Sequence, residues 1–323
     1  MTTETKFKME VPSLPKVPDK IGLYKTTKPS EEKQKKQLES LTSSLGLKKG
    51  LKSLSETPEG FSVGEGDHVL ETYEESDSIW YSDMSKLVEE PEEPMDIKRA
   101  LGVKSDDEIE KTARNRAEDF LKANDLLPKE AYPIGLEEAV FAAVELGEEE
   151  AAETVVTGVQ TNFGFKLDGI DVVGPGAKIA VNFGSDGEIV GLFKAWREVK
   201  KDRSIPTIPP KEALEKFQNS KVFAELKEDS KVSVKKFYLA YYALPAFEPQ
   251  EYLFPVYVFE GEVKTPSGGK MDNIFITNCF DEWKPTEPSR KIQLINMLLE
   301  KLGFWMRVST PVSSGVIPML RRE

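Results

Sequence analysis

The feature that most constrains the fold is a pattern that recurs along the chain: an amphipathic helix followed by a run of β-strands. It predicts helices near 30–46, 106–124 and 210–225. The clearest strands follow the second helix, where Thr154–Phe165, Lys178–Phe183 and Ile189–Trp196 alternate apolar and polar residues. Asp186-Gly187 separates the last two runs, and Asp-Gly there predicts a type I′ hairpin turn, which needs positive φ at both central residues. The pattern predicts an α+β protein with helices packed on antiparallel sheets.

The composition supplies material for real cores and excludes some classes of function. The chain has 323 residues, of which 39% are hydrophobic, enough for two or three domains. Its net charge of −12 argues against general nucleic-acid binding, which needs a basic face. No stretch approaches the roughly 18 apolar residues of a membrane span. Because residues 1–8 lack the apolar core of a secretory signal, a cytoplasmic location is expected for the chain as given, and an extracytoplasmic one if a signal was removed.

The single cysteine and the single histidine argue against covalent catalysis. Cys279 lies in the apolar run Asn273–Phe280, which predicts a buried, unreactive thiol on a strand, and it excludes an intramolecular disulfide. His68 lies far away in an alternating run and is expected on a surface strand. A histidine-rich metal site is therefore excluded, and no D-x-D-x-D-G loop suggests a carboxylate cation site. No metal and no cofactor is expected.

Proline-rich and acidic stretches mark the predicted domain boundaries. The acidic linker lies at Glu89–Glu93, and three prolines fall within Ile205–Pro210. Between them, Ser105 and Glu108 form a capping box for the second helix, and a further short helix is predicted over Leu136–Leu146. Before the acidic linker, Lys48–Glu59 is expected to be a loop. A last amphipathic helix is predicted over Ser289–Leu302. The predicted segments are an extended proline-rich lead-in (1–29), three helix-plus-sheet units (30–90, 95–203 and 204–285), and a C-terminal helix and tail (286–323).

Part of this pattern resembles a known family of modules. A helix, then GFKLDGIDVVGPGAKIAVNFGSDGEIVGLFKAWREV, then a proline-rich link, a helix and KFYLAYYALPAFEPQEYLFPVYVFEGEV, is similar to PepSY and related propeptide-like modules. These include the fungalysin–thermolysin propeptide type and the YycH/YycI-like regulators. The resemblance, over roughly residues 12–280, implies tandem units in which a helix packs on a curved antiparallel sheet, as in cystatin. It also implies inhibition, chaperoning or regulation of a protein partner, and it carries over no functional residues. Such proteins are usually exported or lipid-anchored.

The aromatic strands of the third predicted unit are the best candidate binding surface. One face of these strands must be core, and the other would expose tyrosine rings suited to peptide or small-ligand contact. On this hypothesis Phe237, Leu239 and Phe254 carry the core, and the loop 245–249 closes over a groove. The alternative is core packing of the rings, with hydroxyls reaching the rim. The candidate binding residues are Tyr238, Tyr241, Tyr242, Phe247, Tyr252 and Tyr257.

Two classes of function follow. The leading hypothesis is non-enzymatic recognition or regulation of a protein or peptide partner through a sheet face or an edge strand. The alternative is an enzyme or small-molecule binder that uses an apolar cavity between sheet and helix. In that case Glu248, Glu251 and Asp272 are the candidate acid/base carboxylates, and the competing interpretation is that these side chains face solvent.

Overall fold

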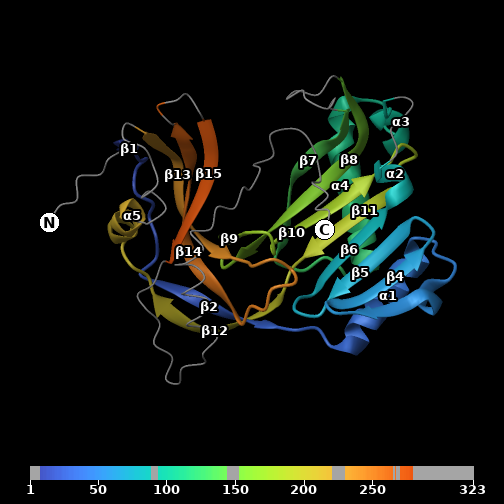
Figure 1. The fold of residues 1–323 in the computed structure, drawn as a ribbon, viewed down its shortest axis with the longest axis horizontal. Coiled ribbons are helices and arrows are strands. Elements are labelled where there is room, and N and C mark those ends of the chain that lie inside the picture. Colours follow the sequence, from blue (N-terminus) through green and yellow to red (C-terminus); the bar gives the residue numbers. More distant parts are fainter. Residues whose placement is uncertain are drawn as a thin grey trace. The chain divides into compact units, whose positions relative to one another are not determined.

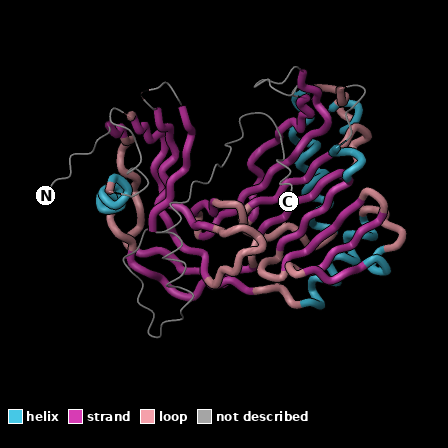
Figure 2. Tube along the Cα trace, in the orientation of Figure 1, coloured by secondary structure: helices cyan, strands magenta, loops and turns pink. Residues whose placement is uncertain are grey.

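The computed structural model describes residues 8–88, 94–143, 153–219, 230–264, 266 and 270–278. These residues form a few helices and long, mostly antiparallel strands (Figures 1 and 2), which confirms the α+β class. They divide into two compact units. Of the described residues, the first unit contains those within 8–25, 201–242 and 252–278, and the second contains those within 26–200 and 243–251. The predicted division into 1–29, 30–90, 95–203, 204–285 and 286–323 stays a prediction.

The second unit is built on an antiparallel sheet in which two helices each precede a run of strands. Helix α1 (Glu31–Ser44) precedes β3 (Leu54–Thr57), β4 (Gly60–Glu65), β5 (His68–Tyr73) and β6 (Ser78–Asp83). Helix α4 (Ile109–Ala123) precedes β7 (Ala131–Ala143), β8 (Glu153–Leu167), β9 (Ile170–Val173), β10 (Lys178–Phe183) and β11 (Ile189–Ala195). The strand order is β3-β4-β5-β6-β11-β10-β8-β7, with β9 pairing the end of β8. The two runs meet where β6 pairs with β11.

Helices α1 and α4 cover the same face of this sheet. Lys35 of α1 lies over the ring of Phe61 on β4, and Arg116 of α4 lies over Phe183 on β10. The side chains that share this face with those two rings are almost completely buried: Val63, Leu70, Ile79, Val159, Phe163, Ile179, Val181 and Leu192. Because side chains alternate along a strand, the residues between them point to the opposite face, which is called the open face below.

The first unit packs one short helix against a second set of strands. The strands are β1 (Lys8–Glu10), β2 (Lys20–Thr27), β12 (Glu198–Pro206), β13 (Lys231–Tyr242), β14 (Tyr252–Lys264) and β15 (Lys270–Asn278). Their order is β12-β2-β14-β13, with β15 pairing β14 and β1 pairing β13 in parallel. Helix α5 (Pro210–Gln218) stacks Phe217 on Phe259 of β14, with the ring centroids 4.0 Å apart.

Local signals in the sequence predicted several elements well, and long-range pairing overturned others. The capping box of Ser105 and Glu108 is present before α4, and β10 has the predicted bounds. The predicted helix Leu136–Leu146 is wrong as far as residue 143, because this segment is strand β7, held by pairing with β8 from Ala131 to Ala143. Within the expected loop Lys48–Glu59 lies strand β3, which pairs with β4.

The Asp186-Gly187 hairpin forms with a different turn from the predicted type I′. Gly187 has φ of 75°, but Asp186 is not among the residues with positive φ. The amide of Gly187 donates to the carbonyl of Gly184 at 2.9 Å, which closes the turn. A Cβ at position 187 would lie 2.0 Å from the carbonyl oxygen of Ala100. Close approach of this backbone therefore requires a glycine there, besides its positive φ.

Some predictions concern residues outside the described part of the chain. These are the last helix (289–302), Cys279 and the end of the third predicted helix (220–225).

His68 lies on β5, where its Nδ1 is 3.0 Å from the hydroxyl of Tyr81. In the part of the chain that the structure describes, no helix has the length and apolar character needed to cross a membrane.

A buried ion pair holds the end of β11 to the turn between β5 and β6. Lys194, only 1% exposed, donates to the backbone carbonyl of Asp77 at 2.7 Å and to its carboxylate. The Asp77 carboxylate also accepts from the amide of Gln37 at 3.1 Å and lies 3.1 Å from the ammonium of Lys33, both on α1. Burial alone would raise the pKa of Asp77, but Lys194 and then Lys33 hold it below its ordinary value.

We expect Lys194→Met and Asp77→Asn each to lower the free energy of unfolding by about 3–5 kcal/mol, because each leaves an uncompensated polar group in the interior. Urea unfolding monitored by tryptophan fluorescence measures this. Lys122→Met is the matched control, since it removes an exposed ion pair with Glu118 and should cost at most about 0.5 kcal/mol. Equal losses in Lys194→Met and Lys122→Met would contradict a structural role of the buried pair.

The ion pair of Asp77 and Lys194 predicts that the free energy of unfolding depends on pH. Because the pKa of Asp77 in the folded protein lies below 3.8, its contribution is complete above that value and is lost as the pH falls through the lowered pKa. The difference in unfolding free energy between the wild type and Asp77→Asn should therefore shrink below about pH 4. A difference that stays constant from neutral to strongly acidic pH would show that Asp77 does not titrate as argued.

Candidate functional site

The candidate site is organised by an arginine that directly follows a buried aromatic anchor. Trp196, one residue beyond β11, stacks on Phe165 of β8, with centroids 4.0 Å apart and planes 4° from parallel. Its amide donates to the hydroxyl of Ser78 at 3.3 Å. Both rings are at most 2% exposed, so the backbone after β11 is fixed in the core. Arg197 follows and is itself only 1% exposed.

Arg197 binds three backbone carbonyls of one loop, residues 243–251 of the second unit, called the Arg197 loop below. Its Nη1 donates to Leu244 O at 2.8 Å, and its Nη2 donates to Pro245 O and Glu248 O, both at 2.6 Å. A hydrogen bond with a charged donor is roughly twice as strong as a neutral one. The planar guanidinium therefore fixes the path of the loop at three points.

Neutral hydrogen bonds hold the same loop at further points. The hydroxyl of Ser76, in the β5–β6 turn, donates to Ala246 O at 2.8 Å. Within the loop, the side-chain oxygen of Gln250 accepts from the amide of Leu244 at 2.9 Å. The turn at 174–176 also contributes, because the amide of Gly176 donates to Ala243 O at 3.2 Å. A Cβ at Gly176 would lie 1.9 Å from Leu244 O, so only glycine allows the loop to approach this closely.

The burial of Arg197 has an electrostatic cost that nearby carboxylates reduce. Burial lowers the pKa of Arg197 to about 10, while the charges of Glu75 and Glu248 oppose the shift. The guanidinium therefore keeps its charge at neutral pH. Its Nε and the Oε2 of Glu75 are both buried, and neither has a hydrogen-bond partner in the described structure. The positive charge is thus held by the three carbonyls and by the field of the two carboxylates.

The outer side of the Arg197 loop presents an exposed aromatic ring. Phe247 is 54% exposed, whereas its neighbours on the inner side, Ala246 and Gln250, are 6% and 5% exposed. Among the large hydrophobic side chains that the described structure exposes, Leu14, Ile134 and Phe247, it is the one aromatic. Aromatic side chains give large contact areas and dominate many protein interfaces. The arrangement can therefore insert a ring into an apolar pocket of another molecule.

The structure places the predicted binding residues in different surroundings. Phe247 lies on the Arg197 loop of the second unit, whereas the five tyrosines lie on β13 and β14 of the first unit. Tyr241, Tyr242, Tyr252 and Tyr257 are at most 8% exposed, so the prediction that the rings of Tyr241, Tyr242 and Tyr252 are partly exposed is wrong. The six residues do not form one surface patch.

Backbone carbonyls explain why tyrosines occupy this core. The hydroxyl of Tyr241 donates to Gly22 O at 2.8 Å, and that of Tyr257 donates to Ile208 O at 2.8 Å. Tyr238 is half-buried, and its hydroxyl donates to the carboxylate of Glu260. Among the residues predicted to carry the core, Phe237 is buried, and Leu239 and Phe254 are half-buried. A tyrosine with a satisfied hydroxyl is therefore a core residue here.

The candidate acid/base residues do not gather in a buried site. Glu248 and Glu251 are exposed on the Arg197 loop. Asp272 lies on β15 of the first unit, and its side chain is outside the described part of the chain. Arg197, which organises the loop, was missed by sequence reasoning, and the only signal for it was a charged residue at the end of an apolar run.

We expect Arg197→Met to free the Arg197 loop, because three part-buried carbonyls lose a charged donor, and a hydrogen bond to a charged group contributes about 1.5–3 kcal/mol. Amide hydrogen exchange should become much faster over 243–251 and stay unchanged in α1. Arg99→Met, at an exposed arginine, is the matched control. Unchanged protection of the loop in Arg197→Met would show that other contacts hold it.

Tyr241→Phe should lower the free energy of unfolding by about 1–3 kcal/mol, because Gly22 O loses its buried donor. Chemical denaturation gives the value. Phe247→Ala, at an exposed ring, is the control and should change stability by less than about 0.5 kcal/mol. The opposite ranking would mean that the tyrosine hydroxyl does not serve the core.

No family model matches the chain, and no curated protein matches it. A crystal structure of an uncharacterized protein from Eubacterium rectale is similar with a TM-score of 0.46 and 11% identity, covering 88% of this chain and 92% of that chain. YycH from Bacillus subtilis is similar with a TM-score of 0.37 and 11% identity, covering 76% of this chain and 49% of that chain. This chain therefore spans about half the length of YycH. At these scores the likenesses establish no function, and the resemblance to PepSY modules stays a prediction.

Proposed function

We propose that the protein is a non-enzymatic binding protein that recognises a protein partner through the Arg197 loop, with Phe247 as the anchor. The observation that carries the proposal is the contrast within one loop. Arg197 fixes three carbonyls on its inner side, while Phe247 on its outer side is 54% exposed. A buried cation is a costly way to hold a surface loop. The cost of burying Arg197 is explained if the function of the protein requires the ring of Phe247 to be held in a fixed position.

A loop that is already ordered gives a binding advantage. Immobilising a flexible loop on association opposes binding, and preorganisation removes much of that cost. The anchor of the proposed interface also lies beside Glu248, whose carboxylate is exposed while its carbonyl is bound to Arg197. We therefore propose a partner pocket that accepts an aromatic ring and carries positive charge at its rim.

We also infer that the second unit contains two copies of one helix-plus-strands element, as the predicted tandem organisation implies. Its strand order supports this. From one edge of the sheet inward the strands are β3, β4, β5 and β6, and from the other edge inward they are β7, β8, β10 and β11. A helix precedes each of these two runs in the sequence, α1 the first and α4 the second. A regulatory or inhibitory role is what the PepSY-like resemblance adds to the proposal. The alternative of an enzyme with acid/base carboxylates has less support, since Glu248 and Glu251 lack the burial that separates pKa values.

Site-specific photo-crosslinking in the cells that naturally make the protein tests the proposal. We expect a photoreactive phenylalanine analogue at position 247 to give an adduct of defined mass. The same analogue at position 122, whose lysine is 58% exposed on α4, is the control and should not give this adduct. Excess unlabelled wild-type protein should suppress the adduct, and excess Phe247→Ala protein should not. Equal adducts at both positions, or equal suppression by both competitors, would contradict a specific role of Phe247.

With the partner identified, Phe247→Ala should weaken binding by about 1–3 kcal/mol, as expected for an aromatic anchor, mainly through faster dissociation. Calorimetry and kinetic binding measurements would give both numbers. Arg197→Met should weaken binding as well although it leaves the ring in place, because the loop would then have to be ordered on association. Unchanged affinity in Phe247→Ala would rule out the ring as the anchor.

A further inference from the structure

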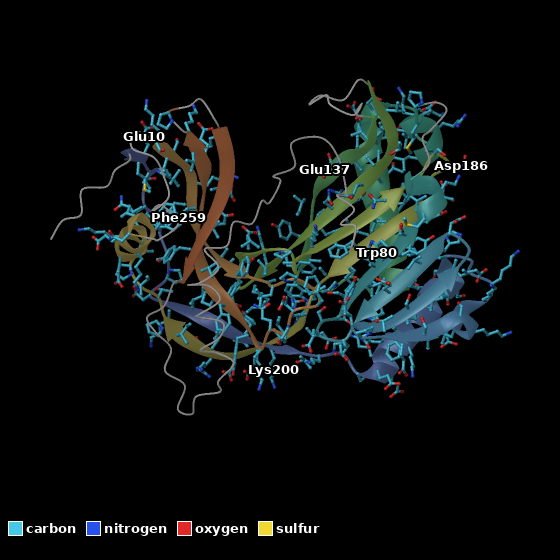
Figure 3. All side chains as sticks on the ribbon, in the orientation of Figure 1. Glu10, Trp80, Glu137, Asp186, Lys200 and Phe259 are labelled. Carbon is cyan, nitrogen blue, oxygen red and sulfur yellow. The ribbon has the colours of Figure 1, made fainter. Side chains whose placement is uncertain are left out.

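The open face of the second unit carries two aromatic residues at opposite positions of neighbouring strands. Trp80 on β6, labelled in Figure 3, is directly opposite Phe193 on β11 in the antiparallel ladder, and both side chains are half-buried. When helices cover only one face of an antiparallel sheet, the other face usually carries polar residues. Two large rings on that face therefore point to contact with another molecule.

A cross-strand row extends from the rings in both directions. On one side, Glu71 of β5 is directly opposite Trp80. On the other side, Ala180 of β10 is opposite Phe193, and Asn162 of β8 is opposite Ala180. The row thus places a carboxylate, two rings, a methyl group and an amide next to one another, with neighbouring strands about 4.8 Å apart.

Negative charge lies on the Glu71 side of Trp80. Burial, and then the charge of Glu59, raise the pKa of Glu71. Tyr73 lies two residues after Glu71 on the same face and hydrogen-bonds to it, and burial together with both carboxylates raises the pKa of Tyr73 to about 12. In the described structure neither Glu59 nor Glu71 forms an ion pair with a lysine or arginine. The charge beside Trp80 is therefore not neutralised within the described part of the chain.

The ring of Phe193, opposite Trp80, already has a cation over its face. The ammonium of Lys178 on β10 lies 5.1 Å from the centre of Phe193, a cation on an aromatic face. For Trp80, by contrast, the described residues provide no cation and no ring contact. Trp80 has the most favourable ring for a cation, and it has a carboxylate next to it in place of a lysine.

We propose that the open face binds an arginine side chain of an extended peptide segment, with the guanidinium stacked on Trp80 and paired with the carboxylate of Glu71. A guanidinium fits this position better than an ammonium, because it is planar, stacks on aromatic faces and pairs with a carboxylate through two parallel hydrogen bonds. The proposal is independent of the Arg197 loop, since neither Trp80 nor Glu71 contributes to the contacts that hold that loop.

NMR titration of the full chain with short capped peptides tests this inference. The probes are acetyl-Gly-Gly-Arg-Gly-Gly-amide and the same peptide with lysine or citrulline in place of arginine. The indole N–H signal of Trp80 is assigned by its absence in Trp80→Phe. We expect a saturable shift of this signal with the arginine peptide. Binding should be about tenfold weaker with the citrulline peptide, which keeps the planar shape without the charge, and several-fold weaker with the lysine peptide.

Glu71→Gln should weaken binding of the arginine peptide about tenfold and leave the weak binding of the citrulline peptide unchanged. Glu188→Gln, on the β10–β11 turn, is the matched control and should leave arginine-peptide binding unchanged. No saturable shift of the Trp80 signal, or equal affinity for arginine and citrulline peptides, would overturn the proposal. Equal weakening by Glu71→Gln and Glu188→Gln would show only general attraction of a cation to an acidic protein, which would also overturn it. Triple-resonance NMR on the wild-type protein gives the same assignment, so the citrulline comparison holds even if Trp80→Phe does not fold.

Discussion

The Arg197 loop depends on one buried guanidinium. Removing an arginine from water costs several kcal/mol, and the three carbonyls of Leu244, Pro245 and Glu248 offset this cost by accepting charge-assisted hydrogen bonds. A lysine could not replace Arg197, because an ammonium lacks the planar fork that reaches three acceptors spread along a loop. The position of Phe247 in space is therefore a consequence of the chemistry of Arg197.

The turn between β5 and β6 connects this loop to the stability of the second unit. Lys194 and Arg197 come from the end of β11, and both are buried beside this turn. Asp77 of the turn pairs with Lys194, the charge of Glu75 acts on Arg197, and the hydroxyl of Ser76 holds the Arg197 loop. Neighbouring residues of one turn thus contact both the core and the Arg197 loop, which ties the loop to the sheet.

The elements that the sequence predicted are those that local patterns determine. Alternation gave the bounds of β10, and Ser105 and Glu108 gave the start of α4, because these signals involve residues a few positions apart. The part of strand β7 from Leu136 onward was predicted as a helix, because its run of Ala, Glu and Leu favours a helix locally, whereas pairing with β8 decides the outcome. Propensity was a weak guide there because it does not include a distant partner.

The candidate site depended on contacts that no local pattern contains. Arg197 meets carbonyls 47 to 51 residues away, and Tyr241 meets Gly22 O at a separation of 219 residues. The sequence prediction placed the ring of Tyr241 on an exposed face, and the contact with Gly22 O shows that this ring belongs to the core. Phe247 was identified from its aromatic character and its proline-flanked loop, whereas the reason for its fixed position became visible only with Arg197.

The most direct test of the central claim is the set of backbone order parameters of Leu244, Ala246, Phe247, Glu248 and Gln250, the residues of 244–250 that carry an amide N–H, measured by NMR relaxation in the wild-type protein. If Arg197 fixes the loop before any partner binds, these amides should show values near 0.85, like those of the strands, although Phe247 is exposed. Values below about 0.6, typical of flexible loops, would contradict the account, because Phe247 would then not be presented in a defined position.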